Sequence, residues 1–311
     1  MKKVLFLGDL NVDLILDGLE DMPVTDREVR CGSFDLEIGS SACIAACAYA
    51  CLGGSSWFCG LAGADYFGDF LLDSLQARGV RVEEVARDSR LRTGVTVNLV
   101  KGNARSQVTY PGSMAEFALQ HVTEKALRDL SHLHVSGIFQ ASALLPHLPR
   151  LMTMAKDAGA TVSLDCQWDP SKRWQHLERW LALSDWLFAN TDEACSMTGK
   201  ADPEDAIREL ASRTSCPVVK AGRRGAMFVD GKKLVRVAAP EVSVVDTVGA
   251  GDNFDAGFLY STLERAMPLH PAVQFASAAA ALSCACRGGT AACSTAAQVD
   301  AFLQAQACRE A

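Results

Sequence analysis

The chain contains 311 residues with a formal net charge of −7, and 49% of its residues are hydrophobic against 22% charged. This balance predicts a globular protein with a sizeable core rather than a disordered chain. The acidic charge argues against binding to nucleic acids or anionic membranes, which requires a basic surface. The apolar stretches are also too short to span a bilayer, which takes about 20 residues.

The twelve cysteines include no Cys-x-x-Cys pair of the kind that binds zinc or carries redox chemistry. Cys43, Cys47 and Cys51 recur at every fourth position, so they lie on one face of a helix, as metal ligands or as small core residues. The first residues contain two lysines but an apolar run of only about four residues, which is too short for a signal peptide. We therefore predict a reduced, cytoplasmic protein.

Residues 2–7 predict a buried strand that ends in Gly8-Asp9-Leu10-Asn11-Val12-Asp13. Polar side chains at the carboxyl end of an early strand are typical ligand contacts in open α/β sheets. We therefore assign Asn11 and Asp13 to substrate binding, with Asp13 accepting hydrogen bonds from a pair of sugar hydroxyls. A simple turn aspartate would explain Asp13 equally well.

Two segments in which apolar and polar residues alternate predict β structure outside the main sheet. They are residues 24–38 and a hairpin over Thr93–Tyr110. Together they predict a small β-sheet over about residues 14–38 and 92–112, either a lid that excludes water from a site or a dimer surface. Between them, Gly39 and Ser40 begin a helix that runs to about Leu52, and they either hold a ligand or cap the helix.

Residues 60–68 predict a glycine-rich loop before a helix over 70–77. From about residue 115, strands and helices alternate regularly, which predicts a mostly parallel sheet covered by helices on both faces. We expect strands at 132–135, 161–164, 186–189 and 217–220, and a hairpin at 226–229 and 234–237. We expect helices at 116–129, 143–158, 171–182, 192–198, 203–213, 252–266, 270–286 and 295–306. The predicted fold is one doubly wound α/β domain over residues 1–311 with the small β lid.

The stretch from Val242 to Phe258 is the most informative in the chain. Its β-branched start predicts a buried strand, and its glycines lead into a helix. Free backbone N–H groups at a helix start bind anions, and glycine allows a close approach. Asp252 stands beside them as a base, ionised with the help of the helix N-terminus. This pairing predicts phosphoryl transfer to a hydroxyl.

Polar groups at three other predicted strand ends fit this reaction. Asn190 and Glu193 could share the hydration shell of a magnesium ion, although a helix capping box explains the same pair. Lys220 begins a cationic glycine turn that could contact phosphate or simply face solvent. The segment 165–169 is either part of a pocket or an ordinary strand end. A Walker A loop and a Gly-x-Ser-x-Gly elbow are both absent from the sequence.

Taken together, these motifs resemble the ribokinase-like (PfkB) carbohydrate kinases. The match is carried by the stretch Asp246-Thr247-Val248-Gly249-Ala250-Gly251-Asp252-x-Phe254-x-Ala256-Gly257-Phe258, which is similar to the C-terminal signature of that family. The resemblance extends over nearly the whole chain, through Gly8 and Asp13, the Gly-x-Asp-x-x-Gly loop at Gly63–Gly68, Thr93-Gly94, Asn190-x-x-Glu193, Gly222, Gly225 and Gly288.

The resemblance implies a role for each matching residue. Asp252 would take the proton from the acceptor hydroxyl, and Gly249, Ala250 and Gly251 would form the anion hole for the transferring phosphoryl group. Asn190 and Glu193 would organise Mg²⁺ and the phosphates of ATP. The nucleotide would be bound by Lys220, Gly222, Gly225 and Ser277. A potassium ion would be held by Asp246, Val248, Ser283 and Gly288.

One segment departs from the family pattern. Where the family has Gly-Gly followed by small residues and an asparagine that contacts the sugar, this chain has Ile38-Gly39-Ser40-Ser41-Ala42-Cys43. Cys43 is a poor hydrogen-bonding partner, so Gly39, Ser40 and Cys43 would line a site for an acceptor that differs from ribose or is less polar.

The predicted function is an ATP-dependent kinase that phosphorylates a hydroxyl of a sugar or sugar-like molecule, with a possible homodimer through the lid. A nucleoside kinase of the same fold would place aromatic lid residues such as Tyr110 and Phe34 on its substrate. A catalytically silent sugar-binding protein is suggested by the altered 39–43 segment. A phosphosugar kinase would use lid arginines, of which Arg27, Arg30, Arg92 and Arg105 are candidates.

Overall fold

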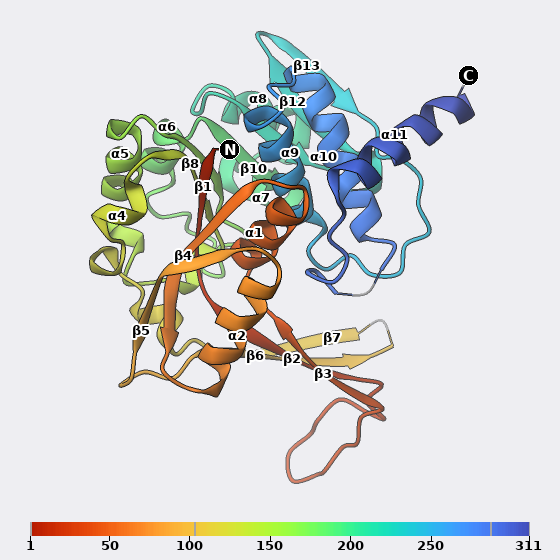
Figure 1. Ribbon diagram of the computed structural model, residues 1–311. Coiled ribbons are helices and arrows are strands. Elements are labelled where there is room, and N and C mark those ends of the chain that lie inside the picture. The colour runs from red at the N-terminus through yellow and green to blue at the C-terminus, as the bar shows by residue number, and fades with distance from the viewer. Residues whose placement is uncertain (1, 103, 287, 311) are drawn as a thin grey trace.

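The computed structural model describes residues 2–102, 104–286 and 288–310. Of residues 309 and 310 it describes only the backbone. Figure 1 shows a large sheet packed among helices and a smaller sheet beneath it. The large sheet has nine strands, in the order β13-β12-β11-β10-β9-β8-β1-β4-β5. In chain order they are β1 (Lys3–Leu7), β4 (Ser55–Gly63), β5 (Arg81–Asp88), β8 (Leu130–Ser136), β9 (Thr161–Asp165), β10 (Trp186–Asn190), β11 (Pro217–Lys220), β12 (Ala226–Asp230) and β13 (Lys233–Val237).

The order in which the chain adds strands to the large sheet reverses at β1. Strands β11 to β5 are parallel, and the hairpin β12–β13 adds an antiparallel edge. From β1 the chain continues to β4 and β5 on one side, then returns to β8 on the other side and proceeds outward to β11. Ligands bind outside the carboxyl ends of the strands at such a switch point. The residues that follow β1 and β8 are therefore expected to border a site.

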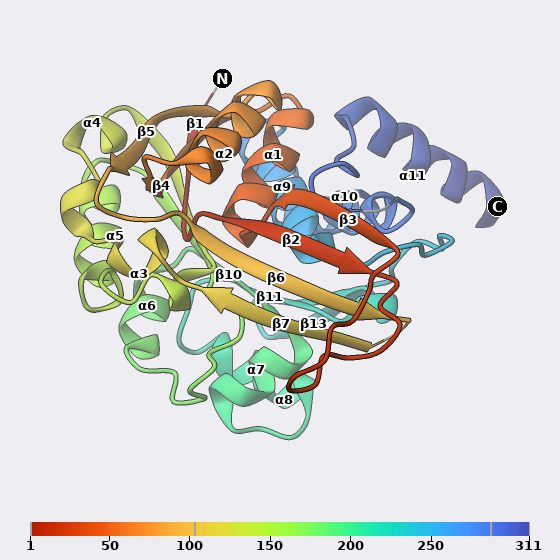
Figure 2. The same ribbon diagram turned by 90° about the horizontal axis from the view of Figure 1, so that it is seen from below.

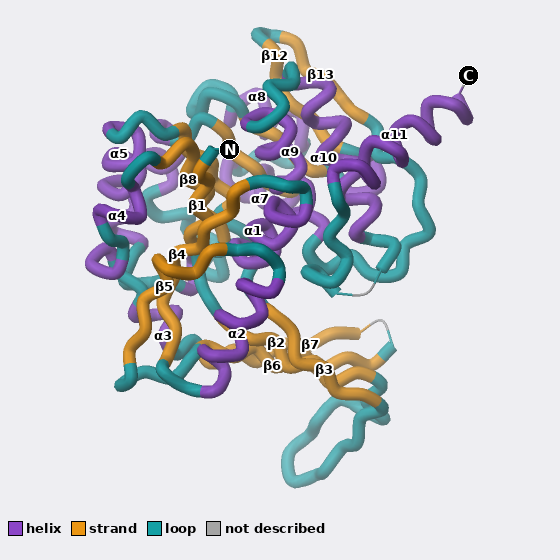
Figure 3. The backbone as a smooth tube through the Cα atoms, in the orientation of Figure 1, coloured by secondary structure: helices purple, strands orange, loops and turns teal. Residues whose placement is uncertain are grey.

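Helices cover both faces of this sheet (Figure 3). One apolar core lies under α1 (Ser41–Cys51), α2 (Tyr66–Ala77), α9 (Ala250–Leu263), α10 (Leu269–Ser283) and α11 (Ala296–Glu310). A second core lies under α4 (Glu124–Leu127), α5 (Leu148–Asp157), α6 (Leu177–Leu183), α7 (Thr191–Thr198) and α8 (Pro203–Leu210). The strands are apolar on both sides because each face is buried. Short elements complete the chain: α3 (Ser113–Glu116) and the 3₁₀ turns Leu119–His121, Ile138–Gln140, Leu145–His147 and Gly222–Arg224.

The smaller sheet has four strands in the order β3-β2-β6-β7. They are β2 (Asn11–Asp17), β3 (Ser33–Ile38), β6 (Gly94–Lys101) and β7 (Ala104–Tyr110), and Figure 2 shows them from below. Only three residues, Gly8 to Leu10, join β1 of the large sheet to β2 of the small one. The two sheets therefore meet directly at the carboxyl end of β1.

The doubly wound α/β class and the separate small sheet are confirmed, whereas several expected elements are wrong. Residues 24–32 form a loop, and β3 starts only at Ser33. The expected loop at 60–68 is instead the end of β4 and the start of α2, and β5 was not anticipated. The expected helix over 116–129 is reduced to short turns and α4. In the described part of the chain, no helix combines the length and apolar character needed to cross a membrane.

A buried polar row crosses the centre of the large sheet. Ser163 Oγ lies 2.7 Å from both His132 Nε2 and His134 Nδ1, and Thr161 Oγ1 lies 2.8 Å from His132 Nδ1. A hydroxyl has one proton, so Ser163 donates to one histidine and accepts from the other. Burial lowers the pKa of His134 to about 4 and that of His132 well below its usual value. Both rings are therefore neutral in the folded protein at neutral pH.

We expect His134 to make the protein less stable in mild acid. Between its folded pKa of about 4 and its unfolded pKa of about 6.5, the unfolded chain binds more protons, so stability falls as the pH falls. Unfolding in urea at pH 7.5 and pH 5.0 should show that His134→Phe loses about 2 kcal/mol less than the wild type over this interval. The ring packs between Phe6 and Phe188, which phenylalanine can also do. An equal loss in both proteins would contradict the neutral buried histidine.

Candidate active site

The start of α9 provides the anion-binding groups that its sequence predicts. Gly249 caps the helix with φ 74°, and a Cβ atom there would lie 2.8 Å from Gly289 Cα and 3.0 Å from Ile44 Cγ2. Only glycine fits this conformation and this close contact. Among the described residues, the backbone N–H groups of Gly251 and Asp252 have no protein acceptor, as expected in the first turn of a helix. These groups can bind an anion.

The segment that precedes this helix is not the buried strand expected from its β-branched residues. Residues 238–249 form a loop without strand pairing, and Val244 and Val245 are exposed. The loop instead borders a pocket of about 860 Å³. The β-branched run therefore lies beside the site rather than in the sheet.

Asp252 is buried at the inner side of this first turn, with 6% of its surface exposed. Burial raises the pKa of its carboxyl to about 7, and the charge of Asp165 adds to the rise, while Lys220 and a hydrogen bond with Ser41 oppose it. The helix N-terminus favours the ionised form of Asp252, but burial outweighs this effect, so the pKa of the carboxyl lies above its ordinary value. A group with a pKa near the working pH is well suited to accept a proton.

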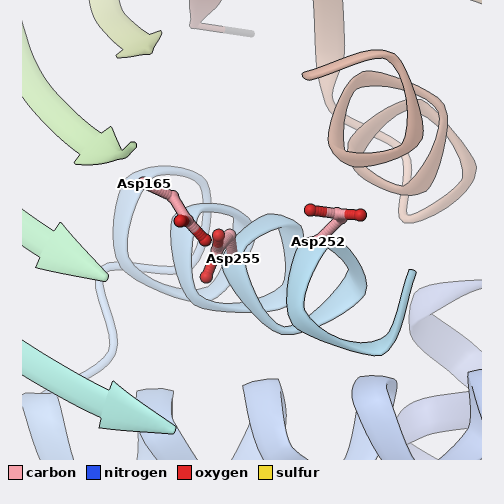
Figure 4. Close-up of side chains that lie close together, drawn as sticks. All are labelled: Asp165, Asp252 and Asp255. Carbon is pink, nitrogen blue, oxygen red and sulfur yellow. The ribbon is translucent and has the colours of Figure 1, made fainter. Parts of the chain in front are cut away.

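A buried ion network lies next to Asp252. Lys220, at the end of β11, places Nζ 2.6 Å from Asp165 Oδ2, 3.1 Å from Asp255 Oδ1 and 3.4 Å from the Gly251 carbonyl oxygen. Figure 4 shows the carboxylates of Asp165 and Asp255 turned toward one another, with Asp252 one turn before Asp255 on helix α9. One oxygen from each of these three aspartates lies within 4.8 Å of the others, and Lys220 supplies the positive charge beside them.

The pocket beside α9 brings together most of the predicted nucleotide residues. Its lining includes Lys220, Gly222, Gly225, Ala250, Gly251 and Ser277. Ser277 Oγ is buried and has no hydrogen-bond partner among the described residues, so it is available to a ligand. Phe254 supplies an apolar wall. A cavity of this volume with a few polar groups is typical of a cofactor or nucleotide site.

Asn190 and Glu193 form the capping box that their sequence allowed as an alternative. Asn190 Oδ1 accepts a hydrogen bond from the Glu193 N–H at 2.9 Å, and Glu193 Oε2 accepts one from the Asn190 N–H at 2.8 Å. Glu193 is buried, which raises its pKa to about 7, and the charge of Asp165 contributes to the rise. A buried carboxylate at a strand end, close to other acidic groups, also has the oxygen chemistry that Mg²⁺ prefers. The capping box does not use Oε1 of Glu193.

The predicted monovalent-cation residues are brought together in part. Asp246 Oδ1 accepts from the Val248 N–H at 3.0 Å, and Asp246 Oδ2 accepts from the Gly288 N–H at 3.1 Å. Ser283 directs its hydroxyl to Ala280 in its own helix, while the carbonyl of the neighbouring Cys284 accepts from the 245 and 246 amides. Carbonyl and carboxylate oxygens in a loop of this kind suit a cation such as K⁺.

The predicted substrate residues lie at the junction of the two sheets. Asn11 is buried and donates from Nδ2 to Asp13 Oδ1 at 3.0 Å and to Thr96 Oγ1 at 3.1 Å. Gly39 lies against this pair, since a Cβ atom there would be 2.4 Å from Asn11 Nδ2 and 2.6 Å from Asp13 Oδ1. Asp13 is partly exposed on the small sheet, and Ser40 caps α1 by accepting from the Cys43 N–H at 3.4 Å.

Cys43 is fully buried in α1 and belongs to the apolar core, as do Cys47 and its neighbours. This burial favours the interpretation of the cysteine row as small core residues over a metal site. Asp9 is a further buried carboxylate of this region: it hydrogen-bonds Ser40, and burial raises its pKa to about 7. Its charge acts on both Asp13 and Asp252.

The loop after β4 ties the small sheet to the body. Asp65 caps α2 by accepting from the Gly68 N–H at 2.9 Å, and its second oxygen accepts from the Thr93 N–H at 2.9 Å. Thr93 Oγ1 donates to Asp65 at 2.6 Å and lies 3.0 Å from the Gly63 amide. The residues of the Gly-x-Asp-x-x-Gly loop therefore fix the point where β6 leaves the main domain.

Comparison with known proteins decides the family. The pattern of the pfkB family carbohydrate kinases matches residues 1–296 of this chain. The chain belongs to this family. Its pfkB-family relatives include the aminoimidazole riboside kinase of Salmonella typhimurium, which is 29% identical over 100% of this chain and 98% of the relative. The 2-dehydro-3-deoxygluconokinase of Bacillus subtilis is 30% identical over 84% of this chain and 85% of the relative.

Solved structures give the same fold. A ribokinase II-like protein of E. coli, in complex with ATP and Mg²⁺, superimposes with a TM-score of 0.88 over 98% of this chain and 100% of that chain, at 22% identity. The resemblance of this sequence to the ribokinase-like family and its predicted fold class are thereby confirmed.

Several residues around the pfkB-family site were not anticipated from the sequence. Asp255 occupies a position that the family signature leaves open, and Asp9 directly follows a strand glycine. Thr96 and Asn98 belong to the hairpin that was expected to form a lid or a dimer surface, but neither was expected to be a site residue. Asp165 was recognised only as an ambiguous strand end. The available signal was a polar residue at the carboxyl end of a buried strand, which Asp9 and Asp165 share.

Proposed function

We propose that this pfkB-family chain is an ATP-dependent kinase that transfers the γ-phosphoryl group to a hydroxyl of a sugar or sugar-like molecule. The proposal rests on one observation above all. Asp252 lies buried beside free amides at the start of α9, in the same first turn as the pocket residues Ala250 and Gly251. Its carboxyl also interacts with Ser41, two residues after the Gly39 that lies against Asn11 and Asp13. A protein that only binds sugar has no need of a base beside an anion site.

In the proposed reaction, Asp252 takes the proton of the acceptor hydroxyl as the hydroxyl oxygen attacks the γ-phosphorus atom of ATP. The bond from that phosphorus to the β,γ-bridging oxygen breaks, and ADP leaves. Gly249, Ala250 and Gly251 form the anion hole in this proposal. Within the described chain, the N–H groups of Gly249, Gly251 and Asp252 are free to stabilise the charge on the transferring group, whereas that of Ala250 donates to the Thr247 carbonyl at 3.3 Å in this structure. Such a transition state needs positioning and charge stabilisation more than covalent help. Gly222, Gly225 and Ser277 hold the nucleotide in the pocket.

Two cations fit residues of this site. Mg²⁺, when bound, neutralises the charge of the ATP phosphates, and Asn190 and Glu193 would hold it through water because Glu193 offers a buried carboxylate oxygen and Asn190 an exposed amide oxygen at the strand end. K⁺ would be held beside the anion hole by Asp246, Val248, Ser283 and Gly288. The N–H groups of Val248 and Gly288 already donate to the Asp246 carboxylate.

The small sheet supports a neutral polyhydroxyl acceptor over the alternatives. Its acceptor-side face carries Asn11, Asp13, Thr96 and Asn98, which suit hydroxyl groups. Tyr110 and Phe34, the aromatic residues expected for a nucleoside, pair with Val95 and Leu16 and so lie on the opposite face. Of the lid arginines, Arg105 hydrogen-bonds Asn98 and its charge acts on Asp13, which makes it the candidate for a substrate phosphate.

An assay of ADP release tests this proposal. Acceptors from each class, namely ketoses, aldoses, sugar acids, phosphosugars and ribosides, are offered with ATP and Mg²⁺, in potassium and in sodium buffers. We expect turnover with a neutral sugar and a higher rate in potassium. Turnover with phosphosugars alone would instead support the Arg105 alternative, and no turnover with any class would support a silent binding protein.

We further propose a homodimer through the outer face of the small sheet. This outer face carries apolar side chains that are largely uncovered: Phe34, Val108 and Tyr110 are 59%, 63% and 54% exposed. They alternate in register with the polar residues of the acceptor side. A flat apolar sheet face of this kind can pack on the same face of a second copy.

We expect Val108→Asp to produce a monomer, because it places a charge among the exposed apolar side chains of the outer face. Light scattering after gel filtration measures the mass directly. Gln107→Asp, on the same strand but the opposite face, should leave the dimer intact. A wild-type protein that is monomeric at micromolar concentration would overturn the dimer.

All twelve cysteines lie within the described residues and are free, which supports a reducing compartment such as the cytoplasm.

A further inference from the structure

The proposed phosphoryl transfer does not itself use the buried ion network of Lys220, Asp165 and Asp255 beside Asp252. An ammonium group has three N–H donors. Those of Lys220 find acceptors on Asp165, on Asp255 and on the carbonyl of Gly251. All three donors are therefore occupied by groups of the chain itself. Although Lys220 lines the nucleotide pocket, it has no free donor left for a phosphate group.

We propose that Lys220, Asp165 and Asp255 form a positioning network that fixes the base Asp252 and the anion hole relative to each other. This inference rests on the proposed function, in which Asp252 is the base. None of the three residues touches the reacting atoms; each acts through the first turn of α9.

The geometry of the network links three elements that carry the site. Asp165 ends β9, Lys220 ends β11, and Asp255 lies one turn after Asp252 on α9. The ammonium lies close under the first turn, since a Cβ atom on Gly251 would be 3.1 Å from Lys220 Nζ. The side chains of Asp165 and Asp255 are 1% and 0% exposed. Without Lys220, two carboxylates would be buried side by side with no cation, which is strongly unfavourable.

The network also determines the charge around the base. The groups that act on Asp252 are Asp9 after β1, Ser41 on α1, Asp165 on β9 and Lys220 on β11, with Asp255 on its own helix. The nearby thiols of Cys43 and Cys293 are neutral, because burial raises their pKa values. Within this set, Lys220 is the one cation. Its removal should make Asp252 harder to ionise, and removal of the Asp165 charge should do the opposite.

The test is the pH dependence of kcat/KM from pH 5 to pH 9. In the wild type, activity should fall on the acid side as Asp252 becomes protonated. In Lys220→Met we expect this acid limb to move up by about one pH unit, and in Asp165→Asn to move down by about one unit. A role in stability alone would lower the melting temperature of both variants without moving their acid limbs in opposite directions. The control is Lys156→Met, which breaks an ion pair with Asp185 on the surface and should leave the limb in place.

Two further measurements keep the test decisive. If Lys220→Met does not fold, Asp165→Asn carries the test. Its acid limb should move down further than that of Asp255→Asn, because burial raises the pKa of Asp255 and leaves its carboxyl largely protonated. The carboxyl titration of Asp252 can also be followed by NMR on ¹³C-aspartate protein, with Asp252→Asn to assign the signal. Opposite shifts there support the network even if no acceptor is phosphorylated, a result that would sink only the proposed function. Unchanged titration in all variants would overturn the network while turnover by the wild type upholds the kinase.

Discussion

Replacing Asp252 by asparagine is expected to lower kcat by about 10³-fold, since a positioned general base contributes about 10²–10⁴-fold. The amide has nearly the same shape as the carboxyl but cannot accept the proton of the acceptor hydroxyl. The nucleotide pocket is lined by other residues, so the affinity for ATP should change little. Steady-state ADP release measures the first effect, and calorimetric titration with ATP measures the second.

Asp69→Asn is the matched control, because Asp69 also lies in the first turn of a helix but is exposed and paired with Arg87. Its kcat should remain close to that of the wild type. A fully active Asp252→Asn protein would remove the base from the mechanism. A protein that has also lost ATP binding would point to a collapsed site rather than to lost chemistry.

Replacing Gly249 by alanine is expected to lower kcat by about 10²-fold or more, the usual effect of disturbing one donor of an anion hole. The added methyl group would meet Gly289 Cα at 2.8 Å, so the first turn of α9 must shift away from its position. The amides would then no longer point at the transferring group. Kinetics at saturating ATP and acceptor give kcat directly.

Gly231→Ala separates this effect from backbone strain alone. Gly231 has φ 60°, similar to the 74° of Gly249, but a Cβ atom there meets nothing within 4 Å. It lies in the β12–β13 turn, away from the site. Both variants should lose about 1 kcal/mol of stability from the left-handed conformation, and only Gly249→Ala should lose activity. Equal kcat values for the two variants would contradict the anion hole.

The strands of the C-terminal half could be predicted from the sequence because they form short local patterns. Strands β8 to β11 are apolar runs bounded by polar residues, and their predicted positions agree with the structure to within a few residues. The same logic failed at residues 242–245, where Val242 and Val244 line a pocket and Val245 is exposed, instead of entering a sheet. Periodicity cannot distinguish an apolar pocket wall from an apolar strand.

The polar groups that meet only through the fold were the hardest to predict. Asp165 and Asp255 are 90 positions apart, and each is an ordinary residue in its local context. Only the parallel order of β9, β10 and β11 brings Asp165 and Lys220 to the same edge, beneath α9. Burial then raised the pKa of Asp252, an effect that no local pattern encodes.

The short connection Gly8–Leu10 between β1 and β2 has a consequence for the size of the acceptor. Asp252 belongs to the large body of the protein, whereas Asn11 and Asp13 belong to the small sheet. A molecule that contacts both must bridge the junction between them. The distance from Asp252 to Asp13 then sets a minimum length for the acceptor, because a molecule too short to reach both residues would make no contact with Asp13 on the small sheet. Selection by molecular length would follow from this division, independently of the pattern of hydroxyl groups.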